Sequence, residues 1–245
     1  MEVRRCSTPL SVSEPKPILI VDGNNVLHAC FFKTEFFSED LRAQETLRLF
    51  KERVIGFVRK LHPSKTYVAW DSDNATAWRK SIFPNYKGTR PEKHVALREA
   101  LSEATNINFN NVKVDMAEGD DTIYALCKIF EGKDITIVSS DKDFLQIPQE
   151  QKKVRIFNLL KNDYREIPEY DVALMKSLSG DTSDNLTALV GIGEKKALKL
   201  MESNLTTLTP EQHEIVEKHL QVIKFSKNPN VEQFKKSVAE VISKY

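Results

Sequence analysis

Aspartate residues follow three short apolar runs: Asp22 ends ILIVD, Asp71 ends YVAWD and Asp141 follows TIVSS. In a parallel sheet, functional groups gather beyond the carboxyl ends of the strands, so we expect these carboxylates at one edge. Any one of them has a simpler explanation, because aspartate is a common turn residue and helix N-cap. Together, their charges repel, and burial raises their pKa values. A hard divalent cation resolves this conflict, and ligands that are all oxygen favour Mg²⁺ or Mn²⁺ over Zn²⁺.

Further carboxylates occur in EGDD, SSDKDF and GDTSD, and no histidine interrupts these motifs. They are Glu118, Asp120, Asp121, Asp143, Asp181 and Asp184. The alternative for EGDD is a helix start, since acidic residues in a first turn suit the helix dipole. Two divalent ions about 4 Å apart can activate a water and stabilise the leaving oxygen in phosphodiester cleavage. The carboxylates therefore indicate a metal-dependent hydrolytic site.

The segment WRKSIFPNYKGTRPEK interleaves cations with aromatic residues. Its cations are Arg79, Lys80, Lys87, Arg90 and Lys93, and its aromatic residues are Trp78, Phe83 and Tyr86. Cations bind phosphates, and aromatic faces stack on unpaired bases. The alternative is a solvated loop with aromatic residues packed beneath it. If the segment is helical, Lys87 and Arg90 reach one phosphate together.

The stretch GDTSDNLTALVGIGEKKA places a glycine hairpin, Gly191 to Gly193, shortly after the acidic turn. Lys195 and Lys196 follow at the start of a predicted helix. Glycines permit a tight turn, and helix N-termini present backbone N–H groups to phosphates. A purely structural connection between two helices is the alternative for this hairpin.

The apolar runs predict an α/β fold with a mostly parallel sheet, because strands alternate with helices. Predicted strands cover 18–21, 67–70, 111–115, 134–138 and 154–160, and a long helix covers 41–61. Leu47, Phe50, Val54, Phe57, Val58 and Leu61 recur at helical spacing on that helix. Beyond Pro168 only helical patterns remain, at 171–180, 194–201, 211–223 and 230–244. We therefore predict a flexible leader (1–17), an α/β core (18–170) and a helical region (171–245).

The chain has 245 residues and a formal net charge of +1, so any nucleic-acid binding depends on local basic clusters. Its three cysteines have no zinc-site or disulfide spacing, which favours a reducing compartment such as the cytoplasm. No apolar run approaches the length of a membrane span, so no membrane partner is expected.

From Ile18 to Met201 the sequence resembles the 5′-nuclease family, which comprises flap endonucleases, the nuclease domain of bacterial DNA polymerase I and stand-alone 5′–3′ exonucleases. Five motifs carry the resemblance, in this order: IVDGNN, WDS…WRKSIFPNYKGTR, AEGDD, SSDKDF and GDTSDNLTALVGIGEKKA. The resemblance implies a PIN-like core and Mg²⁺- or Mn²⁺-dependent hydrolysis of DNA at 5′ ends, flaps or branched junctions. It also implies a monomer that acts in replication or repair, with replication proteins as partners, in a bacterial or phage-infected cytoplasm.

The resemblance assigns roles residue by residue. The carboxylates Asp22, Asp71, Glu118, Asp120, Asp121, Asp141 and Asp143 match the family's metal cluster, and Asp181 and Asp184 match those that complete a second ion site. Lys87 and Arg90 match the pair that engages the scissile phosphate, and Arg79 and Tyr86 belong to the same motif. The hairpin with Gly191, Gly193, Lys195 and Lys196 matches a helix–hairpin–helix element (about 172–204) that grips duplex DNA. In several members that element also holds a monovalent cation such as K⁺.

Two departures from the family pattern stand out. The family often has an arginine where NVLHACFF offers Ala29, and the arch segment (about 79–117) is short. A PIN-type ribonuclease shares the carboxylates without requiring the hairpin. A non-catalytic DNA-binding protein with a degenerate site is a further alternative, against which Asp181 and Asp184 argue.

Overall fold

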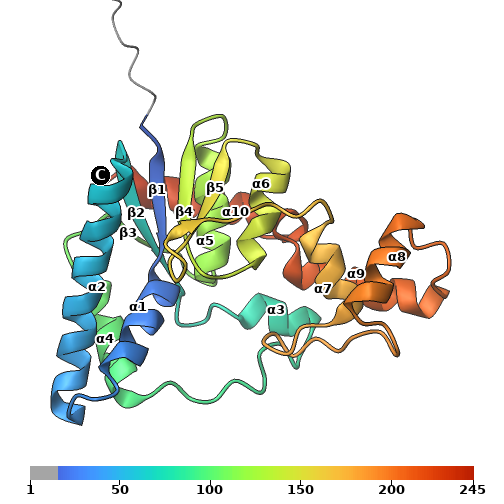
Figure 1. Ribbon diagram of the computed structural model, residues 1–245, viewed down its shortest axis with the longest axis horizontal. Helices are drawn as coiled ribbons and strands as arrows, with labels where there is room; N and C mark the ends of the chain where they lie inside the picture. Colours follow the sequence, from blue (N-terminus) through green and yellow to red (C-terminus); the bar gives the residue numbers. More distant parts are fainter. Residues whose placement is uncertain (1–15) are drawn as a thin grey trace, which may run out of the picture.

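The computed structural model describes residues 16–245, so most of the predicted leader lies outside the described residues. Its centre is a six-stranded sheet in the order β3-β2-β1-β4-β5-β6 (Figure 1). The strands are β1 Ile18–Asp22, β2 Lys65–Trp70, β3 Asn111–Lys113, β4 Ile135–Val138, β5 Val154–Asn158 and β6 Asp163–Tyr164. The first five pair in parallel and the two-residue β6 pairs antiparallel to β5. The mostly parallel sheet is confirmed, whereas β6 is too short to leave a pattern in the sequence.

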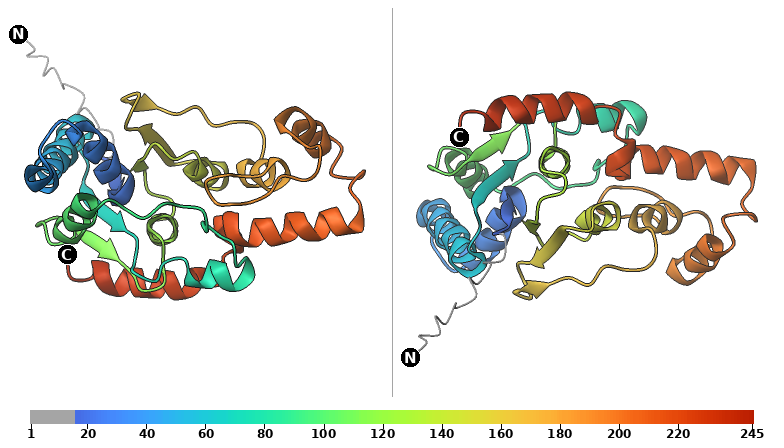
Figure 2. Two further views of the ribbon diagram at one scale, coloured as in Figure 1. Left: turned by 90° about the horizontal axis from the view of Figure 1, so that it is seen from below. Right: turned by 90° about the horizontal axis from the view of Figure 1, so that it is seen from above.

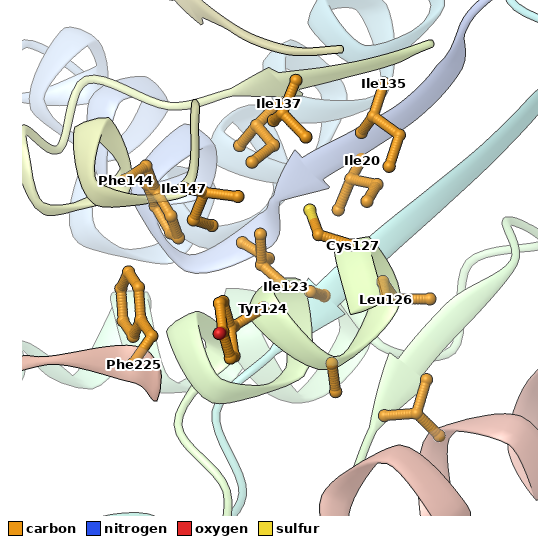
Figure 3. Close-up of a cluster of buried hydrophobic side chains, with 14 of the residues drawn as sticks. Ile20, Ile123, Tyr124, Leu126, Cys127, Ile135, Ile137, Phe144, Ile147 and Phe225 are labelled. Carbon is orange, nitrogen blue, oxygen red and sulfur yellow. The ribbon is translucent and has the colours of Figure 1, made fainter. Parts of the chain in front are cut away.

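Helices cover both faces of the sheet, because the strand residues alternate between two cores. Leu19 and Val21 of β1 face the helices α1, α2 and α4, whereas Ile18 and Ile20 face α5 and α10. The bounds are α1 Gly23–Phe31, α2 Glu39–Leu61, α4 Val95–Ala104, α5 Gly119–Ile129 and α10 Val231–Ile242. Figure 3 shows the second core, in which Ile123 and Leu126 of α5 pack against Ile20, Ile135 and Ile137.

The long predicted helix forms as α2, and Leu47, Phe50, Val54 and Phe57 are buried on it. Val58, predicted on the same apolar face, is instead 37% exposed. The apolar stripe that α2 buries is therefore narrower than the sequence pattern indicates.

A smaller helical unit extends from one end of the sheet (Figures 1 and 2). It contains α7 Val172–Ser179, α8 Glu194–Glu202 and α9 Pro210–Ile223 around a separate cluster of buried residues that includes Leu178, Ala197 and Leu220. The remaining short elements are α3 Ala77–Ile82, α6 Gln146–Glu150 and 3-10 turns at Phe32–Thr34, Asp143–Leu145 and Phe225–Lys227.

The C-terminal end corrects the predicted boundary at residue 171. Phe225, Phe234 and Val238 join the core beside α5, so α10 returns along the sheet and belongs to the α/β core (Figure 2). The predicted arch (about 79–117) is not a free-standing loop, because α4 lies within it and buries Ala96, Leu97 and Ala100 against the core. The part of the predicted arch at 83–94 forms no helix or strand, and residues from Lys87 to His94 line the cleft at the carboxyl edge of the sheet.

Candidate active site

Six carboxylates line one cleft of about 550 Å³ at the carboxyl edge of the sheet. Five of them form what we call the inner carboxylate group: Asp22, Asp71, Glu118, Asp120 and Asp141. The sixth, Glu92, belongs to the connection that precedes α4. Asp22 ends β1, Asp71 follows β2, Asp141 follows β4, and the remaining two begin α5. Because β1, β2 and β4 are parallel neighbours, their ends bring these side chains together, as the sequence predicts.

Two of these carboxylates also hold the local structure. Asp22 accepts from the backbone N–H of Asn25 at 3.0 Å, as the N-cap of α1, and from the Ser139 hydroxyl at 2.8 Å. Asp71 accepts from the N–H of Gly119 and from the Asn24 amide, each at 2.7 Å. The N-cap explanation and the cleft location therefore both apply to Asp22, since a carboxylate oxygen has lone pairs for more than one partner.

A second cluster lies where the helical unit meets the core. Asp143, Asp181 and Asp184, the outer carboxylate group, each offer an oxygen within 4.8 Å of the others. A bridge between Asp181 and Leu186 closes the turn that carries two of them, with N–H to O distances of 2.9 and 2.8 Å. Gly180 is required there, because its φ is +79° and a Cβ would lie 2.5 Å from the Ala188 nitrogen.

Lys176 is a site residue that the sequence analysis missed. Its ammonium lies 2.5 and 2.6 Å from the two oxygens of Asp143 and also forms an ion pair with Asp181. It is the one charged side chain in α7, VALMKSLS, which is the signal that could have identified it. Lys176 partly neutralises the outer group from the side of α7.

The pKa values of several carboxyls reflect the crowding of negative charge. Burial, followed by smaller effects that include the charges of Asp141 and Asp71, raises the pKa of Asp22 to about 7. Burial and the charge of Asp141 raise the pKa of Asp143 to about 7, although Lys176 opposes the shift. Burial also raises the pKa values of Asp120 and Asp184.

These donors fit a hard divalent cation. Every side chain in the two groups offers carboxylate oxygen, the ligand that Mg²⁺ and Mn²⁺ prefer. A cation would also offset the repulsion that raises the pKa values, since opposite charge favours the ionised carboxyl. The inner and outer groups would hold the ions.

The raised pKa values predict how metal binding depends on pH. Asp22 and Asp143 keep their protons up to a pH of about 7, whereas in the unfolded chain their ordinary pKa is 3.8. Their contribution to the stability of the metal-free protein is therefore lost as the pH rises from about 4 to about 7. Cations need the deprotonated form, so Mg²⁺ affinity should rise up to about tenfold per pH unit per proton released below a pH of about 7.

Calorimetric titration with Mg²⁺ at about pH 5.5, 6.5 and 7.5 checks this, together with the Mg²⁺-induced shift in Tm. The Asp22→Asn variant removes one of the titrating groups and should flatten the dependence. Equal affinity at all three pH values would contradict the prediction.

Lys87 and Arg90 connect the two carboxylate groups. The Lys87 ammonium donates to Glu118 of the inner group and lies 3.9 Å from Asp184 of the outer group. Arg90 lies 3.4 Å from Asp184, donates to the carbonyl of Ser183 at 3.1 Å and keeps half of its side chain exposed. The segment is not helical, since Lys87 has a φ of +53°, yet successive turns still direct both cations to Asp184.

Three predicted site residues instead form a buried ion network. Arg79 is 3% exposed and donates twice to Asp121 at 2.7 Å, and its Nη1 also pairs with Glu118 at 2.7 Å. Asp121 accepts a further bond from Asn228, and the Tyr86 hydroxyl donates to Glu118 at 3.0 Å. Arg79 and Tyr86 are therefore engaged by protein partners rather than free for a phosphate, and Asp121 is not among the carboxylates that line the cleft.

This network explains the ionisation of Glu118. Burial alone would raise its pKa, but the charges of Arg79 and Lys87 outweigh burial and lower the pKa. Glu118 therefore stays ionised beside neighbours whose pKa values are raised. The network therefore keeps one negative charge, that of the Glu118 carboxylate, in the inner group.

The glycine hairpin lies at α8, at the far end of the helical unit from the sheet (Figure 1). Gly191 has a φ of +72°, Gly193 is the N-cap of α8, and Lys195 is exposed on its first turn. The Lys196 ammonium donates to the Gly191 carbonyl at 2.8 Å, so it closes the hairpin from outside.

The fold and the two carboxylate groups define a nuclease-type α/β protein, and comparison with known proteins identifies the family. Residues 17–177 match the family described as 5′-3′ exonuclease, N-terminal resolvase-like domain. A 5′-3′ exonuclease of Mycoplasmopsis pulmonis is 30% identical over 210 residues, which cover 79% of this chain and 68% of the relative. The chain belongs to the 5′–3′ exonuclease family.

A further relative and a solved structure are similar to the chain. DNA polymerase I of Bacillus subtilis is 28% identical over 78% of this chain, which spans only 24% of that polymerase. The crystal structure of the T5 D15 protein, co-crystallised with metal ions, shares the fold with a TM-score of 0.70 at 18% identity, covering 92% of this chain and 99% of that one. Among residues 16–245, we find no helix long and apolar enough to cross a bilayer.

Proposed function

We propose that the chain hydrolyses phosphodiester bonds of DNA at 5′ ends or at junctions of single strand and duplex, with Mg²⁺ or Mn²⁺ held by the inner and outer carboxylate groups. The single observation that carries this is the placement of Lys87 and Arg90 between two groups of oxygen ligands. A related T5 structure is described as a flap endonuclease complex with DNA and metal ions, which supports the substrate class.

The chemistry divides between the ions and the side chains. When bound, the ions supply water activation and stabilisation of the leaving oxygen. Lys87 and Arg90 bind the oxygens of the scissile phosphate between the two groups, because charge-assisted hydrogen bonds to phosphate are strong. Lys87 stays protonated in this position, since the charges of Glu118, Asp120 and Asp184 raise its pKa although burial acts to lower it.

Lys87 should contribute more to turnover than to binding, since it faces charge that develops on the phosphate. We expect Lys87→Ala to lower the single-turnover rate by about 100-fold and to change the Kd for DNA far less. Lys80→Ala is the matched control, because Lys80 is exposed on α3. Equal losses in rate and affinity would make Lys87 a binding residue only.

The hairpin and α8 are proposed to grip the duplex away from the carboxylates. Replacing Lys195 and Lys196 with Ala should weaken duplex binding and reduce the slope of log K against log salt by about 1 to 2, since each phosphate contact releases counterions. Lys218→Ala together with Lys235→Ala is the control. These lysines lie on α9 and α10 rather than on α8, and each pairs with a glutamate of its own helix. An unchanged slope in the hairpin variant would count against this grip. The K⁺ site at the hairpin, action as a monomer, a cytoplasmic location and contacts with replication proteins stay predictions.

One assay tests the proposed function directly. Flap, nicked and blunt substrates carrying a label at the 5′ or the 3′ end are incubated with and without Mg²⁺, alongside RNA versions. Product lengths distinguish exonuclease from flap cutting, and Mg²⁺-dependent products from DNA are expected. Cleavage of RNA alone would favour the PIN-type ribonuclease, and DNA binding without products would indicate a non-catalytic protein.

A further inference from the structure

Ser140, the residue before Asp141 of the inner carboxylate group, is held by each of its polar groups. Its backbone N–H and its hydroxyl both donate to the side-chain amide oxygen of Asn25 on α1, at 2.9 and 2.8 Å. Its carbonyl oxygen accepts from the guanidinium of Arg165. The main chain that enters Asp141 is therefore fixed from two sides, by α1 and by the segment after β6.

The peptide unit between Ser140 and Asp141 belongs to a chain of hydrogen bonds that ends on Asp22. Arg165 donates to the carbonyl oxygen of this unit, and the N–H of the unit, which is that of Asp141, donates to the Ser139 hydroxyl oxygen at 3.0 Å. The Ser139 hydroxyl donates in turn to Oδ2 of Asp22 at 2.8 Å. A cation stands at one end of this chain and an inner carboxylate at the other. Because each hydrogen bond polarises the next, such a chain is stronger than its separate bonds.

The turn after β5 brings Arg165 to this place. The N–H of Arg165 donates to the Ile156 carbonyl of β5 at 2.9 Å, which extends the antiparallel pairing of β5 with β6. β5 is also the parallel neighbour of β4, and Ser139 and Ser140 directly follow β4. The two-residue β6 thus returns the chain so that the Arg165 guanidinium reaches the segment that carries Asp141.

Packing alone does not account for an arginine at position 165. Its Nε is buried without a hydrogen-bond acceptor among residues 16–245, and a buried donor without a partner is unfavourable. An apolar side chain would avoid that cost. The guanidinium instead directs a charge-assisted hydrogen bond, roughly twice as strong as a neutral one, at a single carbonyl of the carboxylate segment.

We propose that Arg165 is a positioning residue of the active site, which holds the carboxylates of Asp141 and Asp22 in place for a divalent cation through the Ser140 peptide and the Ser139 hydroxyl. The inference rests on the proposed function and adds a residue outside the five motifs that identify the family. Hydrogen-bond partners of metal ligands raise metal affinity, and their loss typically lowers affinity or activity about 10- to 100-fold.

The first test measures Mg²⁺ binding without DNA. Arg165→Met keeps a long side chain but removes the donor, so calorimetric titration should give an apparent Kd for Mg²⁺ at least about 10-fold above that of wild type. Arg165→Lys should recover most of the affinity, because an ammonium can still donate to the carbonyl. Arg155→Met is the matched control, since Arg155 is exposed on the same turn and its guanidinium lies over the Tyr164 ring.

Cleavage provides a second readout that separates affinity for Mg²⁺ from turnover. In Arg165→Met, the Mg²⁺ concentration that gives half of the maximal single-turnover rate should rise by the same factor as the Kd. The rate at saturating Mg²⁺ should approach that of wild type, because Mg²⁺ in excess refills the site. A loss of rate that saturating Mg²⁺ does not restore, with an unchanged Kd, would overturn the inference.

A double variant tests the chain of hydrogen bonds. Ser139→Ala interrupts the chain between Asp141 and Asp22, so adding it to Arg165→Met should raise the Kd for Mg²⁺ by less than the product of the two single effects. The inference is overturned if the effects multiply, if Arg165→Met binds Mg²⁺ as tightly as wild type, or if the Tm without Mg²⁺ shows that both Arg165 variants are unfolded. Mg²⁺ binding that depends on Arg165 in a protein that cuts no DNA would support the positioning role and overturn only the proposed hydrolysis.

Discussion

Asp141→Asn is expected to slow DNA cleavage by about 1000-fold while leaving the Kd for DNA nearly unchanged, because one metal ligand contributes several kcal/mol to the transition state. The amide has the size of the carboxylate, and its oxygen can still accept the hydrogen bond that the Asp143 N–H donates at 2.9 Å. The fold should therefore persist. The slower cleavage would then result from the loss of the negative charge of Asp141 and not from a change in the structure of the site.

The same variant should change the ionisation of its neighbours. The charge of Asp141 contributes to the raised pKa values of Asp22, Asp120 and Asp143, so its removal should lower all three. The metal-free Asp141→Asn protein should consequently have a higher Tm than wild type near pH 7. Asp115→Asn, at an exposed position, is the control for both measurements. Mg²⁺-dependent cleavage at the wild-type rate would refute the role of Asp141.

Arg79→Met should lower the free energy of unfolding by about 3 to 5 kcal/mol, since it leaves buried charges without a partner. Arg79 is 3% exposed, and its guanidinium faces the buried carboxylates of Asp121 and Glu118. It also donates to the Val222 carbonyl at 2.9 Å, which joins α3 to the end of α9. Urea denaturation measures the loss.

A double variant distinguishes the charge from the packing of the arginine. Adding Asp121→Asn to Arg79→Met removes one of the stranded charges and should recover part of the lost stability. Arg98→Met, at an exposed position on α4, should change stability little. If Arg79→Met were as stable as wild type, the network would not be a stabilising element, and a phosphate-binding role for Arg79 would be open again.

Much of the site was predictable because its carboxylates are tied to local patterns. Asp22, Asp71 and Asp141 each follow an apolar run, and apolar runs separated by helices form parallel strands whose ends meet. Asp181 and Asp184 were identified from a turn motif next to a glycine hairpin. The order of the motifs only implies a contact between the helical unit and the core at this point. The structure adds it, because each of these two aspartates has a carboxylate oxygen within 4.8 Å of one of Asp143.

The cations were less predictable, because a residue type does not reveal which of several neighbouring cations is buried. Arg79, Lys87 and Arg90 occupy one basic segment, yet Arg79 is inside an ion network while Arg90 keeps half of its side chain exposed. Lys176 lacks any motif partner nearby in sequence, and its contact with Asp143 spans 33 positions. Burial and long-range pairing decide the roles of these cations.

By itself, the sequence determined the parallel sheet and the edge at which its carboxylates gather, because strand periodicity and the residues that end each strand are local properties. The tertiary structure alone decided that α10 returns to the core, that Arg79 and Asp121 neutralise each other inside it, and that Phe32 borders the cleft. Each of these depends on which apolar faces cover one another, and that choice is made by packing between segments far apart in the chain.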